Sequence, residues 1–259
     1  LHNGKIAHEK LQAIVNDVLY PLWERNSVDH SVRTRSETKE SAASDLRVAT
    51  GLLDIRLIAG NPDLVAAVQG DSLEYWRKNT KQNLPELERS LSERHVRAGE
   101  LAYLLEPDLK EARGGLRDIQ ALRAIASSGA IHVPLEKISW AESTLNNVRE
   151  ALHTASGRGK NRLLFQEQDK VAELLKYLDA DALMSDIAQA ARSVDYLLES
   201  TWHRFDHRGK DGLGRFLKKP RTTQVAQGIS IAHQEVFIDE GFGGQAGQAQ
   251  GCECPHQRL

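Results

Sequence analysis

Charged side chains and two adjacent glycines coincide in one stretch of the chain, from Glu100 to Gln120. Its apolar start ends at Glu106-Pro107-Asp108, where proline lacks a backbone N–H and moves the preceding residue out of the helical region. Gly114-Gly115 follows, and paired glycines commonly provide an unusual dihedral or room for another group to approach. The four acids and three bases around the glycines exceed what a turn requires. A charged surface loop between two helices is the alternative.

Three other segments carry residue types that could do chemistry. The alternation of Val28 to Thr34 predicts a short strand with Asp29 and Arg33 on one face. The basic loop Ser156 to Arg162 could hold phosphate through N–H groups and cationic heads, although it lacks the spacing of a P-loop and is otherwise a solvated loop. Cys252, Cys254 and His256 lack the second ligand pair of a zinc site.

The composition is that of a globular protein, and its net charge would not attract polyanions. Hydrophobic residues make up 40% of the chain and charged residues 27%, with a formal net charge of -2. This balance argues against nucleic acid as a partner. No apolar run approaches the length of a membrane span, and both cysteines lie near the end of the sequence, so we expect no membrane and a cytoplasmic location.

Helices must position most of these residues. Apolar residues at intervals of three and four predict helices over 11–22, 45–59, 73–91, 138–152, 171–178 and 183–205. We expect Gly60 to cap the second helix, Pro85 to break the third and His95 to lie at the surface. Ile229 to Asp239 alternates weakly and predicts one strand.

The central stretch resembles a known family. LLEPDLKEARGGLRD (Leu104 to Asp118) is similar to the signature of the bifunctional PII uridylyltransferase/uridylyl-removing enzymes, which modify the nitrogen-signalling PII protein. Further similar segments are DHSVRT from Asp29, DLRVATGLLDIRLIAG from Asp45 and ALHTASGRGKNRLLFQEQDKVA from Ala151. They follow one order over most of residues 1–205.

The resemblance implies a mainly α fold, with a helical bundle-type substrate module and an N-terminal α/β remnant of a nucleotidyltransferase domain. Residues 1–60 would be the remainder of that domain, 61–206 the helical module, and 207–259 a linker with a disordered tail from Gly241. The family's Gly-Ser turn and Asp-x-Asp strand should lie before Leu1, and its HD and ACT domains after this segment. We therefore expect a fragment that is inactive by itself.

The resemblance also implies a reaction, the transfer of UMP from UTP, or AMP from ATP, to a tyrosine of PII with Mg²⁺. In that superfamily three carboxylates hold the metal, and Asp29 matches the place of the third, as a catalytic residue and metal ligand. A solvent-facing aspartate is the alternative. Charge and resemblance assign nucleotide binding to Arg33, Gly114, Gly115, Arg117 and Asp118. The competing function is a non-catalytic helical interaction module, since such helices form a bundle core without an active site.

Overall fold

The computed structural model describes residues 1–24, 29–157, 159–210, 223–226, 229–232 and 235–238, with side chains through residue 205. The chain divides into two units, residues 1–207 and 208–259. The predicted boundary between residues 60 and 61 stays a prediction. None of the described helices is long and apolar enough to cross a lipid bilayer.

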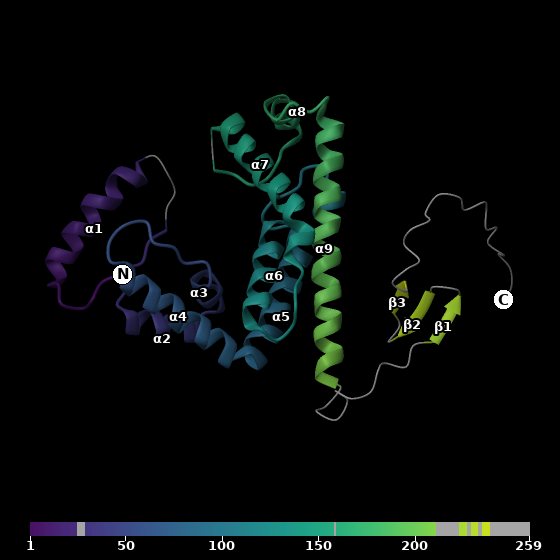
Figure 1. Ribbon diagram of the computed structural model, residues 1–259. Helices are drawn as coiled ribbons and strands as arrows, with labels where there is room; N and C mark the ends of the chain where they lie inside the picture. The colour runs from purple at the N-terminus through teal and green to yellow at the C-terminus, as the bar shows by residue number, and fades with distance from the viewer. Residues whose placement is uncertain (25–28, 158, 211–222, 227–228, 233–234, 239–259) are drawn as a thin grey trace. The chain divides into compact units, whose positions relative to one another are not determined.

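The first unit is helical, which confirms the mainly α fold (Figure 1). Its described helices are α1 (His8–Trp23), α2 (Arg35–Ser44), α3 (Leu46–Leu52), α4 (Pro62–Lys78), α5 (Thr80–Ala98), α6 (Leu116–Ser128), α7 (Ser139–Ser156), α8 (Phe165–Leu174) and α9 (Ala180–Lys210). Two 3₁₀ turns, η1 (Leu101–Tyr103) and η2 (Leu135–Ile138), lie between them.

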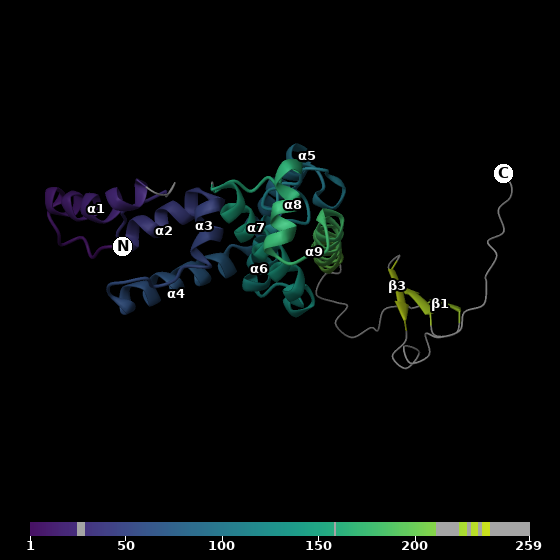
Figure 2. The same ribbon diagram turned by 90° about the horizontal axis from the view of Figure 1, so that it is seen from above.

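Helix α6 lies at the centre of the helical core and packs against α4, α5 and α7. Both views show the long helix α9 beside α5 and α6 (Figures 1 and 2). Leu122 and Ile125 of α6 are fully buried. Trp76 of α4 is also fully buried, and its Nε1 donates to Ala124 O at 2.7 Å. The Trp76 side chain buries a large apolar ring, and its one polar atom is hydrogen-bonded. Trp76 thus anchors α4 on α6.

Two predicted helix ends differ from the structure. The helix that begins after Asp45 ends at Leu52, so Gly60, with φ +105°, caps no helix. Helix α5 continues through Pro85, and the break lies earlier, at Asn79 between α4 and α5. Burial of Leu84, Leu87 and Leu91 on one face of α5 offsets the roughly 3 kcal/mol that an interior proline costs.

Helix α2 is not predicted by the apolar pattern, because most of its residues are polar. A capping box begins it: the Thr34 side chain accepts from Glu37 N, and Glu37 Oε2 accepts from Thr34 N at 2.7 Å. Such a reciprocal pair satisfies two N–H groups that a helix start leaves open. Local capping chemistry, rather than amphipathicity, marks this helix.

The predicted strand from Val28 to Thr34 is wrong for the residues that the structure describes. Residues 29–33 have no regular secondary structure, and only Thr34 makes an isolated parallel bridge, with His2. His2 N donates to Arg33 O at 3.1 Å. Alternating side chains give a strand only where a neighbour supplies hydrogen bonds, and here one bridge is all that forms.

The second unit holds three short strands, β1 (Thr223–Ala226), β2 (Ile229–Ala232) and β3 (Glu235–Ile238). They form an antiparallel sheet in the order β1-β2-β3, with Ile229 opposite Ile238. The single strand predicted over 229–239 is therefore a pair of strands, and β1 lies in the segment predicted as a linker. The tail from Gly241 lies outside the described residues.

Candidate functional site

A buried carboxylate lies at the centre of the signature stretch. Asp118, in the first turn of α6, is fully buried. Its Oδ1 accepts from Arg94 Nη2 at 2.5 Å and lies 2.9 Å from His95 Nε2, both near the end of α5. Its Oδ2 accepts the backbone N–H of Gly114 at 2.6 Å. One side chain therefore joins α5, α6 and the glycine turn.

The surroundings of Asp118 keep it ionised. Burial alone would raise the pKa of Asp118, because the charged form loses its hydration. The hydrogen bond from His95, the charge of Arg94 and the N–H of Gly114 outweigh burial and hold that pKa below its ordinary value. Since an ionised carboxylate only accepts, His95 Nε2 carries the proton of their hydrogen bond.

The two glycines are required by the close approach of the chain's own backbone. Gly114 has φ +83°, and a Cβ there would lie 2.5 Å from Ala191 O of α9. A Cβ at Gly115 would lie 2.8 Å from Leu109 O and from Ala112 O. The expected unusual dihedral and close approach are both present at Gly114, and the group that approaches is helix α9.

The backbone N–H groups at the start of α6 are also engaged within the protein. Gly115 N donates to Ala112 O at 2.9 Å, Leu116 N to Leu109 O at 3.0 Å and Arg117 N to Lys110 O at 3.1 Å. A helix start can bind an anion only while such donors are open. The geometry therefore favours a structural role for the glycine turn over direct contact with a phosphate.

Arg113 fastens the same turn to α9. Its Nε donates to Asp195 Oδ1 at 2.6 Å and its Nη2 to Glu199 Oε1 at 3.1 Å. The hydrogen bond to Asp195 raises the pKa of Arg113, although partial burial works against it. Leu101 N also donates to Arg113 O at 3.0 Å, which holds the start of η1 against the turn.

The basic loop (Ser156 to Arg162) is hydrogen-bonded to the central stretch (Glu100 to Gln120). Leu109 N donates to Asn161 O and Leu163 N to Pro107 O, both at 2.9 Å. Arg162 Nε donates to Glu106 O at 3.2 Å. The end of the loop thus forms an antiparallel bridge with the segment after Pro107, and its arginine is used to hold that bridge.

Arg117 is different, because its side chain faces solvent. It is 46% exposed, and its Nε donates to Glu111 Oε1 at 3.3 Å. Its Nη1 donates to Gln120 Oε1 at 3.2 Å. An exposed pair of this kind contributes about 0–1 kcal/mol, so the guanidinium can exchange its partner for a ligand at small cost. Arg117 keeps its place as a predicted contact.

Asp29 and Arg33 lie on the irregular segment before α2, and Asp29 is exposed. Among the residues that the structure describes, no three His, Cys, Asp or Glu side chains are grouped so that they could hold a metal ion. The described side chains do not form a magnesium site around Asp29. Its assignment as a ligand stays a prediction.

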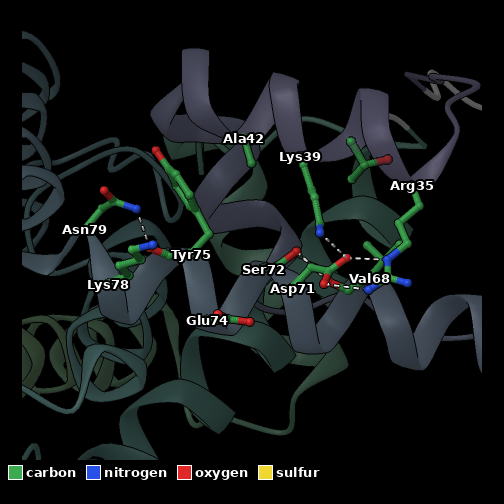
Figure 3. A pocket seen from close by; sticks show the side chains of 11 residues that line it. Arg35, Lys39, Ala42, Val68, Asp71, Ser72, Glu74, Tyr75, Lys78 and Asn79 are labelled. Atoms are coloured by element: carbon green, nitrogen blue, oxygen red, sulfur yellow. Dashed lines mark hydrogen bonds and ion pairs between the residues drawn. The ribbon is translucent and has the colours of Figure 1, made fainter.

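A pocket of about 330 Å³ lies between α2 and α4 (Figure 3). At one end, Arg35 Nε and Nη2 donate to the two oxygens of Asp71 at 2.5 and 2.8 Å, and Lys39 Nζ lies 3.2 Å away. The hydrogen bond from Arg35 lowers the pKa of Asp71 most. Tyr75 and Lys78 lie toward the other end. The ion pairs fasten α2 to α4, and none of the predicted site residues lines this pocket.

The sequence analysis missed the partners of Asp118. His95 was expected at the surface, and that prediction is wrong, because its side chain is only 17% exposed and binds the buried carboxylate. Arg94 is 11% exposed and also donates to Glu111 O at 2.5 Å. More than twenty residues separate these side chains from Asp118. No local spacing reveals such a contact, and a basic cluster on a helix is usually solvated.

The chain is similar to proteins of one kind over most of its length. The family model described as GlnD PII-uridylyltransferase matches residues 82–202. A bifunctional uridylyltransferase/uridylyl-removing enzyme of Streptomyces coelicolor is 46% identical over 203 residues, 78% of this chain and 24% of that protein. Enzymes of the same name from Mycobacterium tuberculosis and Azotobacter vinelandii are 34% and 31% identical, over 92% and 89% of this chain.

The chain spans about a quarter to a third of the length of these relatives, 24%, 31% and 28% in turn. No solved structure matches it significantly. The matched residues 82–202 include the Asp118 cluster, the glycine turn, Arg117 and the basic loop. The similarity thus covers the part of the chain in which the buried contacts are densest.

Proposed function

Because this chain belongs to the GlnD PII-uridylyltransferase family, we propose that it is the helical part of a protein that transfers a nucleotidyl group to PII. In this reaction the hydroxyl oxygen of a PII tyrosine attacks the α-phosphorus of UTP or ATP. This attack breaks the bond between the α-phosphorus and the oxygen that bridges to the β-phosphate. The hydroxyl proton passes to a base, and pyrophosphate leaves. Catalysis of this type depends mainly on positioning and on neutralising charge.

The observation that carries the proposal is the placement of Arg117 beside Asp118. Asp118 is locked by Arg94, His95 and Gly114, so the first turn of α6 is fixed. The next side chain toward the N-terminus, Arg117, is nevertheless half exposed and weakly paired. A rigid support with one cation facing outward suits an anionic substrate, since little entropy is lost when the ligand binds.

The roles within the signature stretch divide accordingly. Arg117 supplies positive charge to the bound nucleotide or to the phosphate oxygens that gain negative charge in the transition state. Gly114, Gly115 and Asp118 act as positioning residues, because they fix the glycine turn beside Arg117. Arg33 remains a proposed contact from resemblance. Mg²⁺ would supply charge neutralisation in such a reaction, with Asp29 as one ligand, although the described side chains do not complete its site.

A transfer assay tests the proposal directly. The full-length protein is incubated with purified PII and with UTP or ATP labelled at the α-phosphate, and label on PII is counted. We expect labelling from one of the two nucleotides and release of pyrophosphate in equal amount. A folded full-length protein that labels PII from neither nucleotide would overturn the proposal. The 259-residue chain by itself is expected to give no label in the same assay.

A non-catalytic helical interaction module is the second candidate, because amphipathic helices with short loops form a bundle core without an active site. It predicts that the chain binds PII equally well with and without nucleotide, and that Arg117→Ala leaves transfer by the full-length protein unchanged. The transferase proposal predicts a loss of transfer in that variant.

A further inference from the structure

A second, smaller pocket lies where α7 meets the connection between α8 and α9. It has a volume of about 210 Å³ and is lined by Thr144, Asn147, Val148, Leu175, Lys176 and Tyr177. Pockets for drug-sized ligands measure about 300–1,000 Å³. This one has room only for a small molecule or ion.

Thr144 presents an unused polar group to this pocket. The residue is 9% exposed, and no hydrogen bond to another described residue engages its hydroxyl. Threonines in a helix usually donate to the carbonyl four residues earlier, as Thr154 does to Glu150 O at 3.0 Å on the same helix. The Thr144 hydroxyl is not among the buried polar atoms without a partner in the described part of the chain, so it is accessible from the pocket and can donate to a ligand there.

Lys176 stands where a glycine would be expected. Tyr177 N donates to Ala172 O at 2.9 Å and Lys176 N to Glu173 O at 3.1 Å, the pattern that ends a helix with one left-handed residue. Lys176 is that residue, with φ +61°, and is the one non-glycine with positive φ among the described residues. Glycine would adopt this conformation without strain, so a lysine at this position carries a conformational cost.

The remaining lining does not oppose a negative ligand. Asn147 is exposed and can turn its amide N–H groups inward. Tyr177 donates its hydroxyl to Asp186 Oδ2 at 2.9 Å. Burial, with this neighbour, raises the pKa of Tyr177 to about 12, so the phenol stays neutral. Asp186 itself does not line the pocket.

We propose that this pocket binds a small oxyanion, with Lys176 supplying the positive charge and Thr144 and Asn147 donating hydrogen bonds. One cation and two neutral donors around a small volume match the oxygens of a phosphate or of a carboxylate. The proposal rests on the geometry of this pocket and is independent of the transferase function, because none of the predicted site residues lines it.

Titration of the 259-residue chain with inorganic phosphate, and separately with acetate, tests the proposal. Ionic strength is held constant with chloride, and ¹⁵N–¹H spectra follow the amides of residues 144–148 and 175–177. We expect saturable shifts confined to these amides with at least one of the two anions. The anion that saturates at lower concentration identifies phosphate or carboxylate as the preferred group.

Variants separate binding from folding. Lys176→Gly and Lys176→Asn both suit the left-handed conformation, so we expect them to melt at or above the temperature of the unchanged protein. Each should weaken anion binding about tenfold or more, since hydrogen bonds to charged groups are about twice as strong as neutral ones. Thr144→Val should weaken it about threefold. Lys81→Ala, a change at an exposed lysine of α5, is the control and should bind as before.

Three results would overturn the proposal. One is the absence of saturable shifts with either anion in the unchanged protein. Another is equal binding by the well-folded Lys176 variants. The third is an equal loss in Lys81→Ala, which would show that only the net charge of the chain matters.

Discussion

The backbone N–H of Gly114 donates to the buried carboxylate of Asp118 at 2.6 Å, across the start of helix α6. The same carboxylate accepts from Arg94 and lies within hydrogen-bonding distance of His95 on α5. The double glycine of the signature is thus held by an aspartate four residues further on. The conformation of the turn and the packing of two helices depend on one charge.

Removing that charge should destabilise the helical unit. In Asp118→Asn the amide keeps the shape of the carboxylate, but Arg94 remains buried without its counter-ion. Breaking a buried pair by changing one partner costs about 3–5 kcal/mol. Urea denaturation should show this loss. The control Asp169→Asn changes an exposed aspartate of α8 and should stay within about 0.5 kcal/mol. Equal midpoints for the two variants would contradict the role given to Asp118.

The same residue predicts a pH dependence. The pKa of Asp118 is lowered in the folded protein, so its contribution to stability is complete above the unfolded value of about 3.9. That contribution is lost as the pH falls through the lower, folded value. The stability difference between the unchanged protein and Asp118→Asn should therefore be constant from about pH 5 to 7 and shrink below about pH 4. An equally large difference at pH 3 would be inconsistent with a depressed pKa.

Gly114→Ala should be strongly destabilising. The new Cβ would meet Ala191 O at 2.5 Å, and φ +83° is a conformation that alanine rarely adopts. Overpacking costs about 1–3 kcal/mol, and the left-handed conformation adds roughly 1–2 kcal/mol. The melting temperature should fall accordingly.

Gly70→Ala is the matched control for this change. Gly70 lies inside α4, and a Cβ there would meet nothing within 4 Å. Alanine in a helix interior is favoured over glycine by roughly 0.5–1 kcal/mol, so this variant should melt at a higher temperature. If both variants shifted the melting temperature in the same direction, the contact between Gly114 and α9 would not be the cause.

Arg117→Ala should lower nucleotide transfer by the full-length protein about tenfold or more, because each 1.4 kcal/mol of lost transition-state stabilisation is one decade in rate. Its melting temperature should change little, since the pair with Glu111 is exposed. Arg123→Ala is the control: that arginine is 48% exposed, lies on the same helix and pairs with Glu142 at 2.7 Å. It should leave transfer unchanged. Equal activity of both variants would make Arg117 structural.

The helices and the family could be predicted from the sequence because periodicity and a contiguous motif are local properties. The helices near 139–156 and 180–205 follow regular apolar stripes, and the glycine pair marked a special backbone conformation correctly. The contacts of the candidate site were not predictable in this way. Arg94, His95 and Asp118 meet because α5 and α6 pack together, and Gly114 meets Ala191 because α9 returns to the turn from late in the chain.

Other differences also have local physical causes. Pro85 was expected to end a helix, but its apolar neighbours Leu84 and Leu87 are buried, so packing outweighs the missing hydrogen bond. The segment before Thr34 alternates as a strand would, yet only one bridge supports it. Sequence patterns report what a segment prefers, whereas a strand also requires a partner.

The bridge between the basic loop and the central stretch has a consequence for how this protein folds. Arg162 and Glu106, which it joins, are 56 residues apart in the chain, and α6 and α7 lie in the loop that the bridge closes. Closing a loop of this length costs entropy before its contacts form. The bridge should therefore form late, after the enclosed helices have assembled. Hydrogen exchange during refolding can measure this, because the amides of Leu109 and Leu163 become protected only when the bridge forms.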